Sequence, residues 1–260
     1  MNNDLHVVDR GAVRTITLNR PASKNGLTHE LGTAIVQAIT GATSANAIVI
    51  GGTNGNFCSG LDLKDAMERG IKAGPELREQ MTASFHGIIR ALRTCGVPTI
   101  AAVDGAAVGF GCDLALACDL RIVSERARFG EVFIKRGLMP DGGGTFLLPH
   151  IIGLGRALEL FYTGDVIDAQ EALRIGMVNR VVPTAELDAR VADLADRFAA
   201  GPPLAYESLK NAVYDNLDET SLSRALDREA DGQMKLLASQ DFAEGVTAFL
   251  QKRDPRFRGQ

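Results

Sequence analysis

Apolar and polar positions follow two different spacings in the first half of the chain. Short apolar or alternating runs predict β-strands, and apolar residues three or four positions apart predict helices between them. The expected strands are residues 5–9, 13–19, 47–52, 97–103 and 120–125, and the expected helices are residues 28–43, 75–93 and 145–153. Because strands and helices alternate, the pattern predicts an α/β fold built of βα or ββα units around a largely parallel sheet.

The pattern changes near residue 185, after which only helical spacing is present. The expected helices there are residues 185–200, 203–216, 221–238 and 240–253. The sequence Gly201-Pro202-Pro203 breaks a helix but is too short to be a domain linker. We therefore expect one α/β core over residues 1–195 and an appended helical C-terminal region over residues 196–260.

The composition of the 260-residue chain is that of a globular protein with a substantial core, since 45% of its residues are hydrophobic. A net charge of −4 and an aromatic content of 5% argue against nucleic acid as a partner. No apolar run reaches the roughly 18 residues of a membrane span, and the N-terminus lacks a signal-peptide pattern, so we expect a cytoplasmic protein without membrane association. The cysteines and histidines show no metal-ligand spacing, which predicts reduced thiols and no metal site.

A glycine-rich stretch, GFGCDL at residues 109–114, follows an expected strand and opens a helix. It partly imitates the dinucleotide-binding fingerprint, but Leu114 stands where that motif needs a third glycine. Two interpretations remain. The glycines allow a tight strand-to-helix junction, or they expose helix-start N–H groups to a developing negative charge. Asp113 then places a carboxylate in an otherwise apolar helical stretch.

A second loop strengthens the interpretation as an anion site. Residues 51–65, GGTNGNFCSGLDLKD, also follow a strand and precede a short helix. Alone they form an ordinary glycine-rich loop. Two such loops in one α/β core would present two N–H groups to one carbonyl oxygen and polarise a thioester or a similar acyl group.

Asp141 lies between Pro140 and three glycines, ahead of a helical stretch. One interpretation is a turn in which Asp141 caps that helix. The other is a general base beside an apolar cavity, where burial would raise the pKa of the carboxyl and suit it to carry a proton. His86 borders an apolar helical face, where a packed or surface histidine is the usual case. The CSGLD sequence is not a serine nucleophile elbow.

Six segments taken together resemble the crotonase (enoyl-CoA hydratase/isomerase) superfamily over residues 5–257. They are NRPASKNGLT, FCSGLDLK, AAVDGAAVGFGCDLALACD, RFGEVFIKRGLMPDGGGTFLLP, YTGDVIDAQEALRIGMVNRVV and FLQKRDPRF. The resemblance implies a crotonase-like spiral of ββα units with a helical trimerisation region, and a homotrimer or homohexamer. It also implies an acyl-CoA thioester as substrate, with coenzyme A entering only as part of that substrate and no separate cofactor.

Carried over position by position, the resemblance implies that the backbone N–H groups of Leu61 and Phe110 form an oxyanion hole for the thioester oxygen. It further implies CoA-contacting and substrate-lining roles for Lys24, Asn25, Gly26, Ser59, Gly60, Asp62, Leu63, Lys64, Gly109 and Phe133, with Phe249 and Lys252 supplied by a neighbouring subunit.

The catalytic acids depart from the family pattern. Hydratases of the family that this chain resembles use two glutamates to hold one water. The resemblance aligns Asp113 with the first glutamate and Phe133 with the second. Glu131 lies two residues before Phe133, on the same face if this stretch is a strand. In family members that shift a double bond, an aspartate in a Pro-Asp turn like that of Asp141 carries the proton.

The favoured hypothesis is therefore an enoyl-CoA isomerase of the fatty-acid-metabolism type, which converts 3-enoyl-CoA to 2-enoyl-CoA through a dienolate with Asp141 as proton shuttle. The alternative is an enoyl-CoA hydratase that uses Asp113. Two further hypotheses are hydrolysis like that of halobenzoyl-CoA dehalogenase, by Asp141 and His86, and a non-catalytic CoA-binding scaffold.

Overall fold

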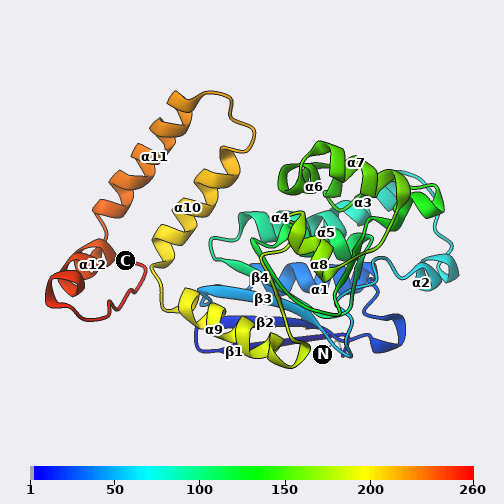
Figure 1. Ribbon diagram of the computed structural model, residues 1–260, viewed down its shortest axis with the longest axis horizontal. Coiled ribbons are helices and arrows are strands. Elements are labelled where there is room, and N and C mark those ends of the chain that lie inside the picture. The colour runs from blue at the N-terminus through cyan, green and yellow to red at the C-terminus, as the bar shows by residue number, and fades with distance from the viewer. Residues whose placement is uncertain (1–2) are drawn as a thin grey trace.

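The computed structural model describes residues 3–260 and contains a six-stranded main sheet (Figure 1). The strand order is β1-β2-β3-β4-β6-β9. β1 pairs antiparallel with β2, and every later pair is parallel. The strands are β1 Leu5–Arg10, β2 Val13–Leu18, β3 Ala47–Gly52, β4 Thr99–Val103, β6 Leu120–Ser124 and β9 Arg180–Val182. The predicted α/β fold with a largely parallel sheet is confirmed.

Helices cover both faces of the sheet, which explains the continuous apolar sequence of its middle strands. In β3, Ile48 and Ile50 pack in the larger core cluster with α1 (His29–Thr40), α4 (Phe85–Thr94) and α5 (Phe110–Ala117). Ala47 and Val49 instead pack in a second cluster with α9 (Leu187–Ala199). Successive residues of one strand therefore support two separate helix layers.

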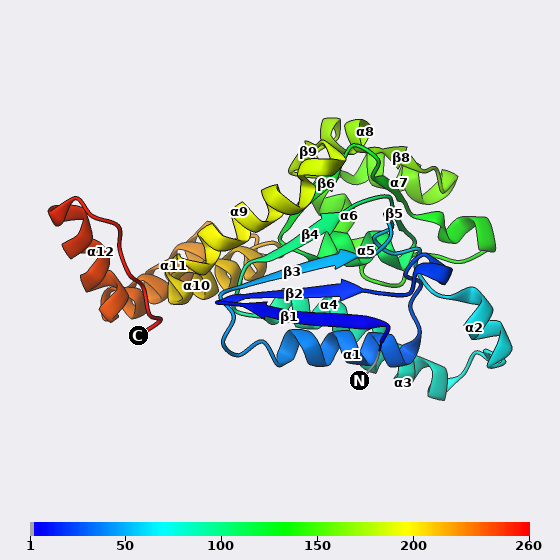
Figure 2. The same cartoon turned by 90° about the horizontal axis from the view of Figure 1, so that it is seen from below.

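A second, three-stranded sheet brings together β5 (Ala106–Val108), β7 (Arg128–Gly130) and β8 (Ile167–Asp168), in the order β5-β7-β8. Its first strand begins three residues after the end of β4, so the small sheet lies beyond the carboxyl end of the main sheet (Figure 2). The remaining helical segments of the core are η1 Pro21–Ser23, α2 Leu63–Glu68, η2 Val132–Arg136, α6 Gly144–Ile152, α7 Leu154–Thr163, α8 Ala169–Arg174 and η3 Thr184–Glu186.

The prediction of one continuous helix over residues 75–93 is wrong, because the structure divides it into α3 (Pro75–Ala83) and α4 at Ser84. The Ser84 hydroxyl donates to the carbonyl oxygen of Gln80 at 2.7 Å, and its Cβ approaches α1 so closely that a Cβ at Gly32 would lie 3.1 Å away. No residue of α3 is buried, whereas α4 buries Phe85 and three others. The break lets α4 enter the core while α3 stays on the surface.

Three C-terminal helices extend away from the core: α10 (Pro203–Asp215), α11 (Leu222–Leu237) and α12 (Gln240–Gln251) (Figures 1 and 2). α9 packs on the sheet, so the division expected between residues 195 and 196 falls inside this helix. Lys210 of α10 joins the two parts through an ion pair of 2.8 Å with Asp119, which also accepts a hydrogen bond from the Tyr214 hydroxyl. Within residues 3–260, no helix is long and apolar enough to cross a bilayer.

Candidate active site

The two glycine-rich loops lie side by side as a short parallel pair. Cys58 N donates to Ala106 O at 2.8 Å, and Val108 N donates to Cys58 O at 3.1 Å, so Cys58 is paired with Ala107. Leu61 is three residues beyond Cys58, and Phe110 is three residues beyond Ala107. The equal offsets bring the amides of Leu61 and Phe110 to the same level of the pair. Neither amide N–H has a hydrogen-bond partner within residues 3–260.

Glycines make this close approach possible. A Cβ on Gly60 would lie 2.9 Å from Val108 O and 3.3 Å from Phe110 N, and a Cβ on Gly111 would lie 2.1 Å from Cys58 O. Gly109 adopts φ 56° and ψ −131°, a conformation that side chains oppose, and it is the N-cap of α5. The glycines therefore serve both a tight junction and the exposure of two free N–H groups at one point. This arrangement can stabilise an oxyanion.

The second glycine run, residues 142–144, lies directly on Asp113. Gly142 N donates to Asp113 Oδ2 at 2.9 Å, and a Cβ on Gly144 would lie 2.2 Å from Asp113 Oδ1. Asp113 is fully buried, and its Oδ1 has no hydrogen-bond partner among the described residues. In this structure the turn that carries Asp141 therefore covers the carboxylate of Asp113.

Glu131 is buried beside Asp113, and neither of its carboxyl oxygens has a hydrogen-bond partner in the described part of the chain. Burial raises the pKa of Glu131 to about 7, and burial together with the negative charge of Glu131 raises the pKa of Asp113 well above its usual value. The idea that Glu131 and Phe133 share one strand face is wrong. β7 ends at Gly130, and Phe133 belongs to the 3₁₀ helix η2.

Asp141 is not a helix cap, since the N-cap of α6 is Gly143 and has no side-chain capping bond. Partial desolvation raises the pKa of the Asp141 carboxyl, opposed by the charge of His86, although the residue as a whole is exposed. The turn packs against the side chain of Phe110, since a Cβ on Gly142 would lie 2.7 Å from Cδ2 of the Phe110 ring. The Phe133 ring is also close, 3.9 Å from the Cβ position of Gly109.

The segment expected to contact CoA is held together from within. Asn25 is buried and donates to Asn56 O at 2.6 Å and to Thr53 O at 3.1 Å. Asp62 caps α2 and pairs with Arg20 at 2.9 Å. Further supports are the bond from Ser59 Oγ to Ser23 O at 2.8 Å and the packing of buried Gly26 against Asp62 Cβ. The exposed residues left beside this frame are Lys24, Leu63 and Lys64.

Phe249 and Lys252 are not brought to the other site residues within one chain. They lie at the end of α12, on the opposite side of the molecule from α2 (Figures 1 and 2). Phe249 is 81% exposed. A contact of these two residues with CoA bound near α2 therefore requires a second copy of the chain, and it stays a prediction.

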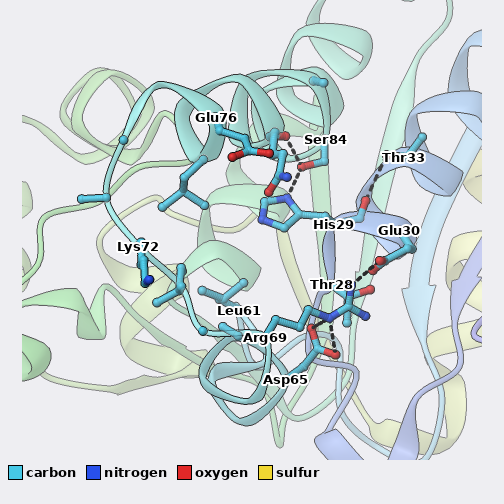
Figure 3. A pocket seen from close by; sticks show the side chains of 18 of the residues that line it. Thr28, His29, Glu30, Thr33, Leu61, Asp65, Arg69, Lys72, Glu76 and Ser84 are labelled. Atoms are coloured by element: carbon cyan, nitrogen blue, oxygen red, sulfur yellow. Dashed lines mark hydrogen bonds and ion pairs between the residues drawn. The ribbon is translucent and has the colours of Figure 1, made fainter.

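A cavity of about 720 Å³ opens beside Leu61 (Figure 3). The N-terminus of α1, α2, the segment 70–74 and α3 enclose it. Sequence reasoning missed its polar groups, among them His29, Arg69 and Ser84. The only local signal is that His29 follows Thr28, which caps α1 by accepting from Leu31 N. Among the described residues, no group of three or more His, Cys, Asp or Glu side chains is arranged to hold a metal ion.

The comparisons with known proteins agree with one another. The family model described as enoyl-CoA hydratase/isomerase matches residues 9–260. The chain is 38% identical to the crotonyl-CoA hydratase of Syntrophomonas wolfei, with 92% of each chain covered, and 34% identical to the 1,2-epoxyphenylacetyl-CoA isomerase of Escherichia coli, with 97% of each covered. The crystal structure of an enoyl-CoA hydratase from Bacillus anthracis superposes with a TM-score of 0.92 at 32% identity, covering 99% of this chain and 100% of that one.

Proposed function

Because the chain belongs to the enoyl-CoA hydratase/isomerase family, we propose that it is an enzyme that converts 3-enoyl-CoA to 2-enoyl-CoA with Asp141 as the proton shuttle. The observation that carries this proposal is the contrast between two carboxylates. Asp113 is fully buried under the Gly142 amide, whereas Asp141 is exposed on the same turn and has no capping role. The exposure of Asp141 supports its choice as the proton carrier, because a molecule entering from solvent can reach its carboxylate more easily than that of Asp113.

The reaction needs a proton to leave C2 and a proton to arrive at C4. The thioester oxygen accepts hydrogen bonds from the N–H groups of Leu61 and Phe110, which stabilise the negative charge that develops when C2 loses its proton. The Asp141 carboxylate takes that proton, and the electron pair of the C2–H bond forms a C1–C2 double bond conjugated with C3–C4, which is the dienolate. The Asp141 carboxyl returns the proton at C4, the thioester carbonyl re-forms, and the double bond now joins C2 and C3. The raised pKa of Asp141 suits both transfers, because it lies closer to the pH at which the enzyme works than the pKa of an ordinary aspartate does.

No water is consumed in this sequence, and the surroundings of the two amides fit that requirement. The Phe133 ring lies next to Gly109, and the family resemblance aligns Phe133 with the second acid of a hydratase. An apolar ring there lowers the chance that a water is held against C3. Asp113 would need the turn at residues 141–144 to move before its carboxyl met a water, because its Oδ2 is bonded to Gly142 N.

Deuterium incorporation decides between isomerase and hydratase. We expect the wild-type protein in D₂O to convert 3-enoyl-CoA to 2-enoyl-CoA, with solvent deuterium only at C2 or C4 and no hydroxyl at C3. Asp141→Asn should lower kcat by about 10²-fold or more, the size of a typical acid–base contribution. Asp113→Asn still offers an acceptor to Gly142 N and should retain most of the activity.

The reverse result, in which Asp113→Asn abolishes turnover and Asp141→Asn spares it, would overturn the proposal. Formation of 3-hydroxyacyl-CoA from 2-enoyl-CoA would favour hydration. Halide release from a 4-halobenzoyl-CoA, lost in Asp141→Asn and His86→Ala, would instead favour the dehalogenase-like reaction. Turnover of none of these thioesters, with binding intact, would leave the scaffold hypothesis.

We also propose that the complete CoA site is formed between copies of the chain in a homotrimer or homohexamer. Exposed Lys64 belongs to α2, and the Lys24 carbonyl accepts from Ser59 N at 3.1 Å, four residues before α2 begins. Exposed Phe249 and Lys252 lie at the end of α12, on the opposite side of the molecule from α2 (Figure 1). Light scattering after size exclusion gives the mass of the assembly. Weaker CoA binding in Lys252→Ala without loss of that assembly would support the shared site.

A further inference from the structure

The cavity beside Leu61 is the space that the acyl part of a bound thioester would reach. Leu61 supplies one proposed oxyanion N–H, and its side chain lines the cavity. A row of rings leads from the other donor to the same cavity: Phe110 packs on Phe85 with ring centroids 5.3 Å apart, and Phe85 stacks on His29 at 4.7 Å. His29 therefore faces the acyl side of the proposed reaction centre, and the inference below rests on the proposed function.

The hydrogen bonds of Ser84 determine which nitrogen of His29 carries the proton. Ser84 Oγ lies 2.7 Å from Gln80 O, which only accepts, so the single hydroxyl proton points there. His29 Nδ1 lies 2.8 Å from the same Oγ and must therefore donate to it. Burial lowers the pKa of His29, which favours the neutral ring. The remaining nitrogen, Nε2, then carries a lone pair and has no hydrogen-bond partner in the described part of the chain.

Arg69 on the facing wall is already paired. Arg69 forms ion pairs with Glu30 and with Asp65, the latter at 3.0 Å (Figure 3). Lys72 and Glu76 also line the cavity but are exposed. A substrate carboxylate would have to compete with two acids for Arg69. The ring of His29 is half-buried, and its Nε2 is instead a neutral acceptor that no other described group occupies.

From this arrangement we infer that His29 accepts a hydrogen bond from a hydroxyl group on the acyl chain, and that the enzyme prefers hydroxylated acyl-CoA thioesters. A hydroxyl suits the cavity because it can donate its proton to Nε2 and still accept a hydrogen bond from water or from another lining group. The cavity volume of about 720 Å³ leaves room for an acyl group considerably longer than four carbons. The hydroxyl group thus identifies the substrate class, and His29 is its specificity determinant.

The test measures a selectivity ratio on matched pairs of substrates. For 3-enoyl-CoA thioesters of six to twelve carbons, with and without a hydroxyl at the far end, we expect at least one chain length to show kcat/KM roughly 3- to 10-fold higher for the hydroxylated member, the value of one neutral hydrogen bond. His29→Phe keeps a ring on Phe85 and should bring the ratio near one. His29→Gln, whose amide oxygen can take the place of Nε2, should restore part of it.

Two further variants separate this role from a structural one. Ser84→Ala frees Nδ1 to lose its proton, so it should lower the ratio although Ser84 need not touch the hydroxyl. His150 provides a matched control, since its ring packs against Phe146 with the centroids 4.4 Å apart, its Nδ1 bonds a backbone carbonyl, and it lies outside the cavity. His150→Phe should keep the wild-type ratio.

Binding of the saturated thioester pairs by calorimetry gives the same comparison without turnover, so it tests His29 even if the double-bond shift is not the reaction. A wild-type ratio of one at every chain length, in both kcat/KM and Kd, would overturn the inference. So would a ratio that His29→Phe and Ser84→Ala leave unchanged. Failure of turnover with a retained Kd preference would refute the proposed function alone.

Discussion

Substituting Gly60 with alanine tests the convergence of the two free amides. The added Cβ would lie 2.9 Å from Val108 O and 3.3 Å from Phe110 N, so the two loops must separate by a few tenths of an ångström to reach ordinary contact. Gly60 also has φ +87°, where an L-residue costs roughly 1–2 kcal/mol. The substitution therefore adds a moderate stability cost to a direct displacement of both oxyanion donors.

The expected catalytic loss follows from what those donors stabilise. Removing one oxyanion donor typically lowers kcat by about 10²- to 10³-fold, and a displaced pair should fall within or beyond that range. We expect Gly60→Ala to lower kcat for the double-bond shift by at least about 10²-fold with a smaller change in KM, because the charge on the oxygen develops in the transition state. Steady-state kinetics and urea unfolding of the same preparation measure the two effects.

Gly176→Ala is the matched control. Gly176 has φ +81°, but no atom lies within 4 Å of the Cβ position. This variant should show the same strain cost in urea unfolding and keep a wild-type kcat. If Gly60→Ala retains kcat within about 3-fold, or if Gly176→Ala loses as much activity, then the closeness of the two loops does not support catalysis and the reasoning fails.

Two other predictions concern stability. Because burial raises the pKa of Glu131 from its ordinary value near 4.5 to about 7, the folded protein keeps a proton that the unfolded chain releases between these pH values, so wild-type stability should fall as the pH rises through this window. The fall in the free energy of unfolding should reach up to about 3 kcal/mol, and Glu131→Gln should make it smaller. If the free energy of unfolding measured in urea falls equally with pH in both proteins, the prediction is wrong. Lys210→Met leaves Asp119 without its cation in a largely buried place and should cost about 3–5 kcal/mol in the same assay, with a loss below 1 kcal/mol as the contrary result.

Much of the fold follows from local pattern, because the strands of a parallel sheet and the helices that cover it have different apolar spacings. The bounds of the C-terminal helices agree with the sequence prediction to within about two residues. The division of α3 from α4 was missed, since the side chain of Ser84 that marks it is unremarkable in sequence and its effect depends on contact with α1. The glycines in the sequence indicated the two loops proposed to form the oxyanion hole, but only the pairing of Cys58 with Ala107 shows that the loops meet.

The carboxylates show where sequence reasoning ends. Asp113 was recognisable as an acid within an apolar helix, but its burial is caused by glycines 29 to 31 residues later in the chain. Glu131 would share a face with Phe133 only if both lay on one strand, and that strand ends at Gly130. Apart from its position after the Thr28 cap, His29 gave no sign of a role, because its tautomer depends on a serine 55 residues away. In each case the decisive contact is long-range, and spacing along the chain does not encode it.

Because Cys58 pairs with Ala107, the number of residues from this pair to Leu61 and to Phe110 positions the two N–H groups, and the side chains at 61 and 110 do not. Any amino acid except proline supplies the same N–H at positions 61 and 110, so this N–H alone does not determine which side chain stands at either position. Deleting or inserting a single residue between 58 and 61, or between 107 and 110, would instead turn one amide toward the opposite side of its strand. Evolution can therefore substitute the catalytic acids and the residues that line the pocket, and so change the reaction, provided that segments 58–61 and 107–110 keep their length.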